Sequence, residues 1–164
     1  MLVGYTDVDL ASDIDSRKST SAYLTTFAGG AVSCQSKFQK CVALSATEAE
    51  YIVATEVCKE IIWMRNFLLE LGYKEDKYVL RCDSQNAIHL AKNSTFHSHS
   101  KHIDVRYHWI QEVLENKLLQ LEKVNTDDNW SDTIAKVLPT KKFKKCYEDA
   151  SVMFPNKVRK GKNS

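Results

Sequence analysis

Three segments within the first 36 residues have the pattern of β-strands. Residues 2–7 alternate with a period of two. Residues 19–27 and 31–36 are further strand-like runs, and Ala28-Gly29-Gly30 between them is typical of a hairpin turn. We therefore predict three strands in an antiparallel meander, with a polar loop over residues 9–18 between the first two.

A long amphipathic helix is predicted next. Ser45 and Glu48 fit the S-x-x-E capping box, and Gly72 provides a C-terminal stop. The apolar residues between them recur at the ~100° per residue of one helical face. Extending that face backwards leads to Glu50, whereas Glu48 points nearly the opposite way. A carboxylate on a buried face is costly without a partner, so Glu50 is a candidate functional residue. The apolar stripe consists of Ala54, Val57, Ile61, Met64 and Leu68.

The second half of the chain predicts two more strands and three more helices. The element order, β-β-β-α-β-α-α-β-α, predicts an α/β fold with a five-stranded mixed sheet, in which three antiparallel strands are followed by parallel strands, and with helices on both faces. We assign the parallel pairing to the first and fourth strands, because only these are separated by a helix long enough to cross over. The expected elements are strands at 78–82 and 118–124, helices at 84–92, 103–116 and 130–138, and a polar turn at 126–129.

Composition narrows the class of protein. A chain of 164 residues, 43% of them hydrophobic, is one domain of ordinary globular size. No run of about 18 apolar residues is present, which excludes a membrane span. The first residues also lack the basic and then apolar pattern of a signal peptide. Five Cys residues without a C-x-x-C pair favour reduced thiols. We therefore expect a cytoplasmic or nuclear protein that is not secreted.

The net charge of +2 conceals an asymmetry. Residues 141–164 hold eight basic side chains against only Glu148 and Asp149, so the rest of the chain is acidic overall. An acidic body with a basic tail is not the usual charge distribution of a protein that only binds nucleic acid. We predict one domain over residues 1–139 and a basic tail over 140–164, which is partly helical or disordered and is more often solvated than a binding element.

Four acidic residues occupy special positions: Asp7 on a strand face, Glu50 on the helical stripe, Asp83 at a strand end and Asp132 in the first turn of the last helix. If the first and fourth strands are neighbours, Asp7 and Asp83 converge below Glu50. Crowded carboxylates raise one another's pKa unless a cation binds, and an all-oxygen ligand set selects Mg²⁺ or Mn²⁺ rather than zinc. Two such ions about 4 Å apart form a clamp for phosphodiester cleavage. Taken singly, Asp7, Asp83 and Asp132 are explained more simply as solvated acids.

Histidines offer a second possible metal site. His97, His99, His102 and His108 cluster in the sequence, but no Cys lies near them and their spacings match no standard zinc finger. A polar loop followed by the start of a helix is the simpler interpretation.

Five motifs resemble the ribonuclease H domain of copia-type retrotransposon polyproteins, especially those of plants. The similarity runs from about Val3 to Pro139, nearly the whole predicted domain. The motifs are GYTDVD at residues 4–9, DSRKSTS at 15–21, VALSATEAEY at 42–51, CDSQNA at 82–87 and SKHID at 100–104.

This resemblance implies the ribonuclease H fold and cleavage of the RNA strand of an RNA–DNA hybrid in reverse transcription, with two Mg²⁺ ions as cofactors and Mn²⁺ as a substitute. Motif by motif, the catalytic, metal-holding acids of the family fall on Asp7, Glu50, Asp83 and Asp132. The choice of Glu50 agrees with the helical stripe.

The resemblance also implies partners and a location. The expected partners are the hybrid and the reverse transcriptase domain of a parent polyprotein, of which this chain would be a fragment, in a cytoplasmic virus-like particle or the nucleus. Ser84, Gln85, Lys101 and Arg106 are our candidate nucleic-acid-binding residues.

Several positions depart from the family pattern. Residues 7–13 read DVDLASD where family members usually have DADWAGD, and Ala22 and Cys34 stand where they have Gly and Trp. Asn125 replaces a His of some relatives. The alternative hypothesis is therefore a catalytically inactive relic, or a domesticated module that binds nucleic acid or protein through the same fold. The four intact acids favour the enzyme, and the altered packing residues favour the relic.

Overall fold

The structure is a computed structural model that describes residues 1–92 and 101–132. Every element predicted inside these ranges is present, with ends that differ by a few residues. The helix predicted over 130–138 and the basic tail lie mostly or wholly outside them. The elements are β1 (Leu2–Asp9), β2 (Thr20–Phe27), β3 (Gly30–Phe38), α1 (Ala46–Glu70), β4 (Tyr78–Cys82), α2 (Gln85–Lys92), α3 (Lys101–Glu115), β5 (Gln120–Lys123) and the 3₁₀ turn η1 (Thr126–Asp128).

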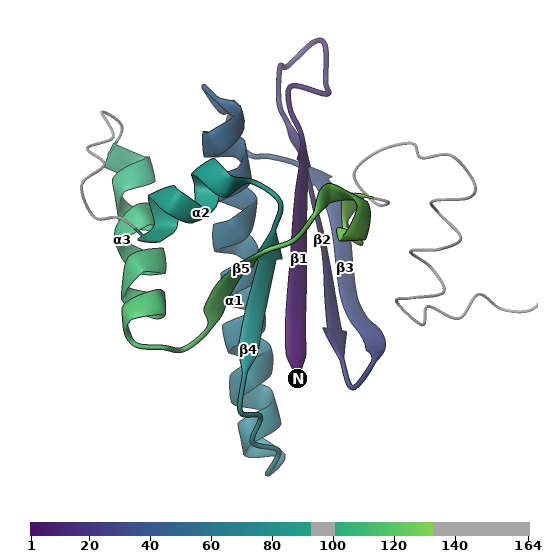
Figure 1. The fold of residues 1–164 in the computed structure, drawn as a ribbon. Helices are drawn as coiled ribbons and strands as arrows, with labels where there is room; N and C mark the ends of the chain where they lie inside the picture. The colour runs from purple at the N-terminus through teal and green to yellow at the C-terminus, as the bar shows by residue number, and fades with distance from the viewer. Residues whose placement is uncertain (93–100, 133–164) are drawn as a thin grey trace, which may run out of the picture.

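The strands form one mixed sheet in the order β3-β2-β1-β4-β5 (Figure 1). β2 pairs antiparallel with both β1 and β3, which confirms the meander. β1 pairs parallel with β4, and Thr6 lies opposite Cys82, which confirms the predicted pairing of the first and fourth strands. β4 also pairs parallel with β5. The expectation that only one long helix could provide a parallel crossover is therefore wrong, because α2 and α3 together provide the second one.

The first turn of α1 is fixed by the predicted cap. The Ser45 hydroxyl accepts a hydrogen bond from the backbone N–H of Glu48 at 3.1 Å. The Glu48 carboxylate accepts in return from the N–H of Leu44 at 2.8 Å, one residue before the partner expected in a capping box. Because these bonds set where the helix begins, they also set where Glu50 lies on it.

Ser45→Ala removes this cap and is expected to lower the free energy of unfolding by about 1 kcal/mol. Urea denaturation of the purified protein measures the change. Ser36→Ala, at an exposed position of β3, is the matched control, with an expected change below about 0.5 kcal/mol. Equal losses in the two variants would contradict the role of the cap.

The far end of α1 closes at a glycine. Gly72 has a φ of +82°, a conformation that favours glycine, and its N–H donates to the carbonyl of Leu69 at 3.0 Å. The N–H of Tyr73 donates to the carbonyl of Leu68 at 2.8 Å, which completes a Schellman motif. The stop predicted at Gly72 is thereby confirmed.

The main hydrophobic core lies between the sheet and the three α-helices, all of which contribute buried side chains to it. α1 packs directly on β1 at Gly4, where an added Cβ would lie 2.8 Å from the side chains of both Val57 and Ile61. On the opposite face, Trp130 stacks on Tyr5 with their ring centroids 4.8 Å apart. The α-helices of the described residues therefore cover one face, and the helix expected on the other falls mainly on residues 133–138, outside them.

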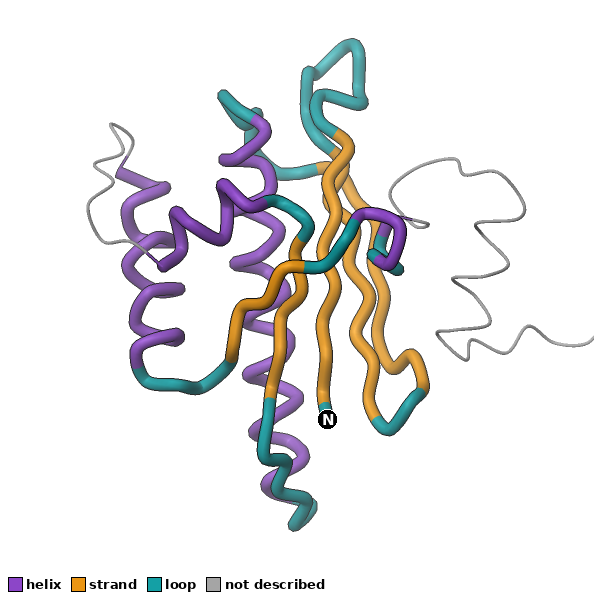
Figure 2. Tube along the Cα trace, viewed as in Figure 1, coloured by secondary structure: helices purple, strands orange, loops and turns teal. Residues whose placement is uncertain are grey.

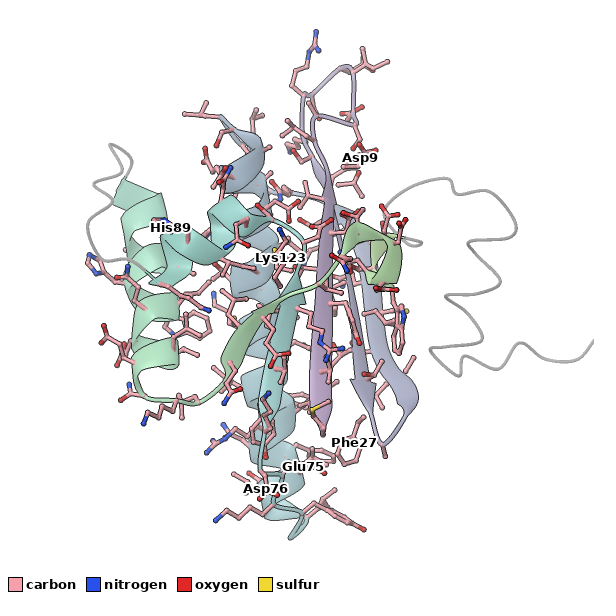
Figure 3. All side chains as sticks on the ribbon, in the orientation of Figure 1. Asp9, Phe27, Glu75, Asp76, His89 and Lys123 are labelled. Atoms are coloured by element: carbon pink, nitrogen blue, oxygen red, sulfur yellow. The ribbon has the colours of Figure 1, made fainter. Side chains whose placement is uncertain are left out.

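The carboxyl ends of β1 and β4 lie at the same edge of the sheet as the start of α1. Figure 2 shows both strands, in orange, entering loops at the top of the view. Figure 3 shows Asp9 and Lys123 toward this end and Glu75 and Asp76 at the opposite end. In residues 1–92 and 101–132, no helix combines the length and apolarity that a membrane crossing needs.

Candidate active site

Two of the four predicted acids meet at the carboxyl edge of the sheet. Glu50, early in α1, and Asp83, directly after β4, form a group with Cys82 in which the ligand atoms all lie within 4.8 Å of one another. Both carboxylates belong to half-buried residues. The Cys82 thiol donates to Glu50 Oε2 at 3.9 Å. The fold thus joins a helix residue to a strand end and creates a set of potential metal ligands.

Glu50 is oriented through the residue that precedes it. Ala49 is buried, and its carbonyl accepts a hydrogen bond from Gln39 Nε2 at 2.9 Å. The same Nε2 donates to Ser21 Oγ at 2.9 Å, so Gln39 ties the start of α1 to β2. Glu48, by contrast, is engaged as a cap at the helix end. These contacts support the choice of Glu50 rather than Glu48 as the site residue.

Asp7 lies beside this group by strand register. Because Thr6 is opposite Cys82 in the parallel ladder, the next residues of the two segments, Asp7 and Asp83, lie at the same edge. Asp7 is only 1% exposed. It does not belong to the group of described residues with ligand atoms within 4.8 Å. Alternation along β1 places Asp7 on the face of Tyr5, whereas Gly4 faces α1.

Asp132 is held at the same end of the sheet by the buried side-chain amide of Asn129. Asn129 is fully buried, and its Nδ2 donates to the carbonyl of Thr6 at 2.7 Å. The N–H of Asp132 donates to the carbonyl of Asn129 at 3.2 Å, and Asp132 is itself 3% exposed. These bonds hold the last described residues against the end of β1, next to Asp7, although Asp132 also lies outside the 4.8 Å group.

Asp83 has a polar neighbour in the turn that follows β5. The Thr126 hydroxyl, at the start of η1, donates to Asp83 Oδ2 at 3.3 Å. Lys123 ends β5 directly opposite Cys82 and contributes a cationic side chain toward the same edge (Figure 3). The site therefore combines carboxylates with a positive charge that a phosphate group could use.

The donor set fits a hard divalent cation. Burial raises the pKa of the Cys82 thiol to about 12, and the negative charge of Glu50 acts in the same direction. Both effects disfavour the thiolate, and hard divalent cations select oxygen over sulfur donors. The oxygens of Glu50 and Asp83 remain as the donors, and Mg²⁺ and Mn²⁺ prefer oxygen.

The residues predicted to bind nucleic acid differ in their exposure and in their hydrogen bonds. The Ser84 hydroxyl caps α2 by accepting from the N–H of Ala87 at 3.2 Å, which gives this serine a structural role. Gln85 is exposed, and Arg106 on α3 is half-buried. Lys101 begins α3, but its side chain lies outside the described part of the chain, as does most of the histidine cluster considered for zinc.

The sequence pattern missed the uncharged residues that hold the acids in place. Gln39, Thr126 and Asn129 each bond to a segment distant in the sequence, and only Gln39 and Asn129 are buried. All three sit in polar stretches that favour loops. Burial separates Gln39 and Asn129 from ordinary loop residues, and periodicity does not reveal burial. Thr126 is exposed and is distinguished only by its bond to Asp83.

Known proteins resemble the chain over most of its length, although no protein-family model matches it. It is 57% identical over 148 residues to the Retrovirus-related Pol polyprotein from transposon TNT 1-94 of Nicotiana tabacum, covering 90% of this chain and 11% of the relative. It is 36% identical over 143 residues to the Retrovirus-related Pol polyprotein from transposon RE1 of Arabidopsis thaliana, covering 87% and 10%. The chain thus spans about a tenth of the length of these curated relatives.

Solved structures share the fold. LC11-RNase H1, isolated from compost, superposes with a TM-score of 0.60 at 12% identity, covering 81% of this chain and 91% of that one. The same enzyme in complex with an RNA/DNA hybrid gives 0.55 at 12% identity, with 81% and 92% covered. At this identity the likeness shows the fold alone. By homology, then, the chain belongs to the retrovirus-related Pol polyproteins of plant transposons, and the segment it represents has the ribonuclease H fold.

Proposed function

We propose that this domain is an endonuclease of the ribonuclease H type, which cleaves the RNA strand of an RNA–DNA hybrid by two-metal-ion hydrolysis. The observation that carries the proposal is the meeting of Glu50 and Asp83 at the edge where β1 delivers Asp7. The fold supports the choice of substrate, since LC11-RNase H1 was solved with an RNA/DNA hybrid.

Each acid has a role in this proposal. Asp7 and Asp83 would serve both metal ions, Glu50 would hold one of them, and Asp132 would hold the other. Bound there, Mg²⁺ or Mn²⁺ supplies Lewis acidity, which makes water a nucleophile at neutral pH and stabilises the departing oxygen. The near-complete burial of Asp7 and Asp132 limits the water around their carboxylates, which strengthens their interaction with a cation.

Substrate binding is assigned to residues around the same edge. Lys123 offers a positive charge toward the site, and Gln85 and Arg106 add polar and charged groups on α2 and α3. We also keep Ser84 and Lys101 as candidates. A hybrid is distinguished from DNA by its shape and its 2′-hydroxyl groups, which are read across the minor groove.

The homology also supports the proposed partners. A segment of a Pol polyprotein is expected to act beside the reverse transcriptase part of that polyprotein, on the hybrid that reverse transcription produces. We place this activity in a cytoplasmic virus-like particle or in the nucleus.

The proposal is tested with a labelled RNA–DNA hybrid and the purified chain. We expect the RNA strand to be cleaved in Mg²⁺, and cleavage to stop when EDTA removes the metal. Asp7→Asn keeps the size of the side chain but removes its charge, and is expected to reduce cleavage to background. Asp76→Asn, an exposed acid at the opposite end of the molecule (Figure 3), is the matched control and should cleave like the wild type.

Equal background from the wild type and Asp7→Asn would overturn the enzyme proposal. A gel-shift assay with the same hybrid then distinguishes the alternative, because a catalytically inactive module would still bind the hybrid without cutting it.

A further inference from the structure

Asn129 joins two segments that each carry one of the acids. Its Nδ2 donates to the carbonyl of Thr6 at 2.7 Å, and its Oδ1 accepts from the Ser131 hydroxyl at 2.6 Å. The N–H of Ser131 also points to Oδ1, at 3.4 Å. Asn129, Thr6 and Ser131 are all fully buried. One amide therefore connects two chain segments that lie 123 residues apart in the sequence.

The two residues that Asn129 bonds are the immediate predecessors of Asp7 and Asp132. A displacement of Thr6 or Ser131 moves the neighbouring acid directly, because adjacent Cα atoms are at a fixed distance of about 3.8 Å. The amide of Asn129 provides both the donor toward the Thr6 carbonyl and the acceptor toward the Ser131 hydroxyl. Its two ends thus fix Asp7 and Asp132 relative to each other.

We propose that Asn129 is a positioning residue, which sets the relative position of Asp7 and Asp132 and through it the affinity of the site for divalent metal. The metal part of this inference rests on the proposed function, and the positional part rests on the hydrogen bonds alone. Residues that orient metal ligands typically change metal affinity by about 10–100-fold when they are removed.

β1 itself offers a matched control. The Thr26 hydroxyl donates to the carbonyl of Val3 at 3.4 Å, and Thr26 is 7% exposed. This bond, like that of Asn129, runs from a buried side chain to a backbone carbonyl of β1, but it lies toward the opposite end of the strand. Thr26→Ala therefore removes a longer side-chain bond to β1 at Val3, away from Thr6 and Asp7, and leaves residues 129–132 untouched.

The experiment compares Asn129→Ala with Thr26→Ala in the full chain. Calorimetry measures Mn²⁺ affinity, urea denaturation measures stability, and hydrogen exchange measures the opening of the Ser131 and Asp132 amides. We expect Asn129→Ala to weaken Mn²⁺ binding at least about 10-fold and to accelerate both amides. Thr26→Ala is expected to leave affinity and exchange close to the wild type even where its stability falls.

Four results would overturn the inference or its positional part. One is a folded Asn129→Ala protein with wild-type Mn²⁺ affinity, and another is an equal loss of affinity in Thr26→Ala. If Asn129→Ala does not fold, Ser131→Ala removes only the 2.6 Å bond to Oδ1, and wild-type affinity in that variant overturns the inference. If the wild-type chain binds no Mn²⁺, the proposed function fails. Unchanged hydrogen exchange of the Ser131 and Asp132 amides in Asn129→Ala would then contradict the claim that Asn129 positions the two acids.

Discussion

Asp83→Asn is expected to reduce RNA-strand cleavage about a thousandfold, equivalent to about 4 kcal/mol of transition-state stabilisation. Asp83 shares its ligand group with Glu50 and follows the central parallel pair of the sheet. The substitution removes a negative charge where a cation must be held, yet an amide oxygen can still accept the hydrogen bond from Thr126. The loss should therefore appear in catalysis and not in folding.

Single-turnover cleavage of the labelled hybrid measures this effect, and thermal unfolding shows whether the variant is folded. Thr126→Val is an informative companion, because it removes the hydrogen bond to Asp83 but leaves the charge. We expect it to retain between about a hundredth and a tenth of the activity, in line with the effect of residues around a metal ligand. A folded Asp83→Asn protein with more than a tenth of wild-type cleavage would contradict the assignment of Asp83 as a ligand.

Gly4→Val is expected to lower the free energy of unfolding by about 3 kcal/mol, the upper part of the range for overpacked cores. The first added carbon alone would lie 2.8 Å from Val57 Cγ1 and Ile61 Cδ1. Val57 and Ile61 are both fully buried, so neither can swing into solvent to make room. α1 must then move away from β1. The expected decrease is a large part of the free energy of unfolding of a typical domain, which is about 5–15 kcal/mol.

Urea denaturation measures the change, and Gly30→Val is the matched control. Gly30 also lies in a strand, but the nearest atom to an added Cβ there is 3.9 Å away, so we expect less than about 1 kcal/mol of change. The steric cause can be checked by rescue, since Ile61→Val removes one methyl group at the point of contact. Gly4→Ala combined with Ile61→Val should be more stable than the sum of the two single losses predicts.

The parts of the fold that depend on local chemistry were predictable from the sequence. Ser45 and Gly72 identified the two ends of α1, and the period-two alternation identified β1. The strand-like runs on either side of Ala28-Gly29-Gly30 identified β2 and β3. That β4 is the parallel partner of β5 was not predictable in the same way. It depends on how α2 and α3 together span the sheet, which is a property of tertiary packing and leaves no periodic signal.

The site residues also differ in how far the sequence could predict them. The helical stripe selected Glu50, and the strand-end position selected Asp83, because both arguments rest on the geometry of a single element. Cys82 joins the group only through the contact of α1 with β4, and Asn129 only through a bond to β1 from the far end of the described chain. Contacts between distant segments have no signature in one sequence. The assignment of all four acids as metal ligands remains a prediction.

The central position of β1 has a consequence for folding during synthesis. β1 comes first in this sequence, and its antiparallel partner β2 begins at Thr20, so one side can close through a local hairpin. Its other partner, β4, begins only at Tyr78, after α1. At about 5–20 residues per second, translation leaves that edge of β1 unpaired for several seconds. An open strand edge promotes pairing with other chains, so slow translation between β3 and β4 is expected to favour aggregation of the nascent chain.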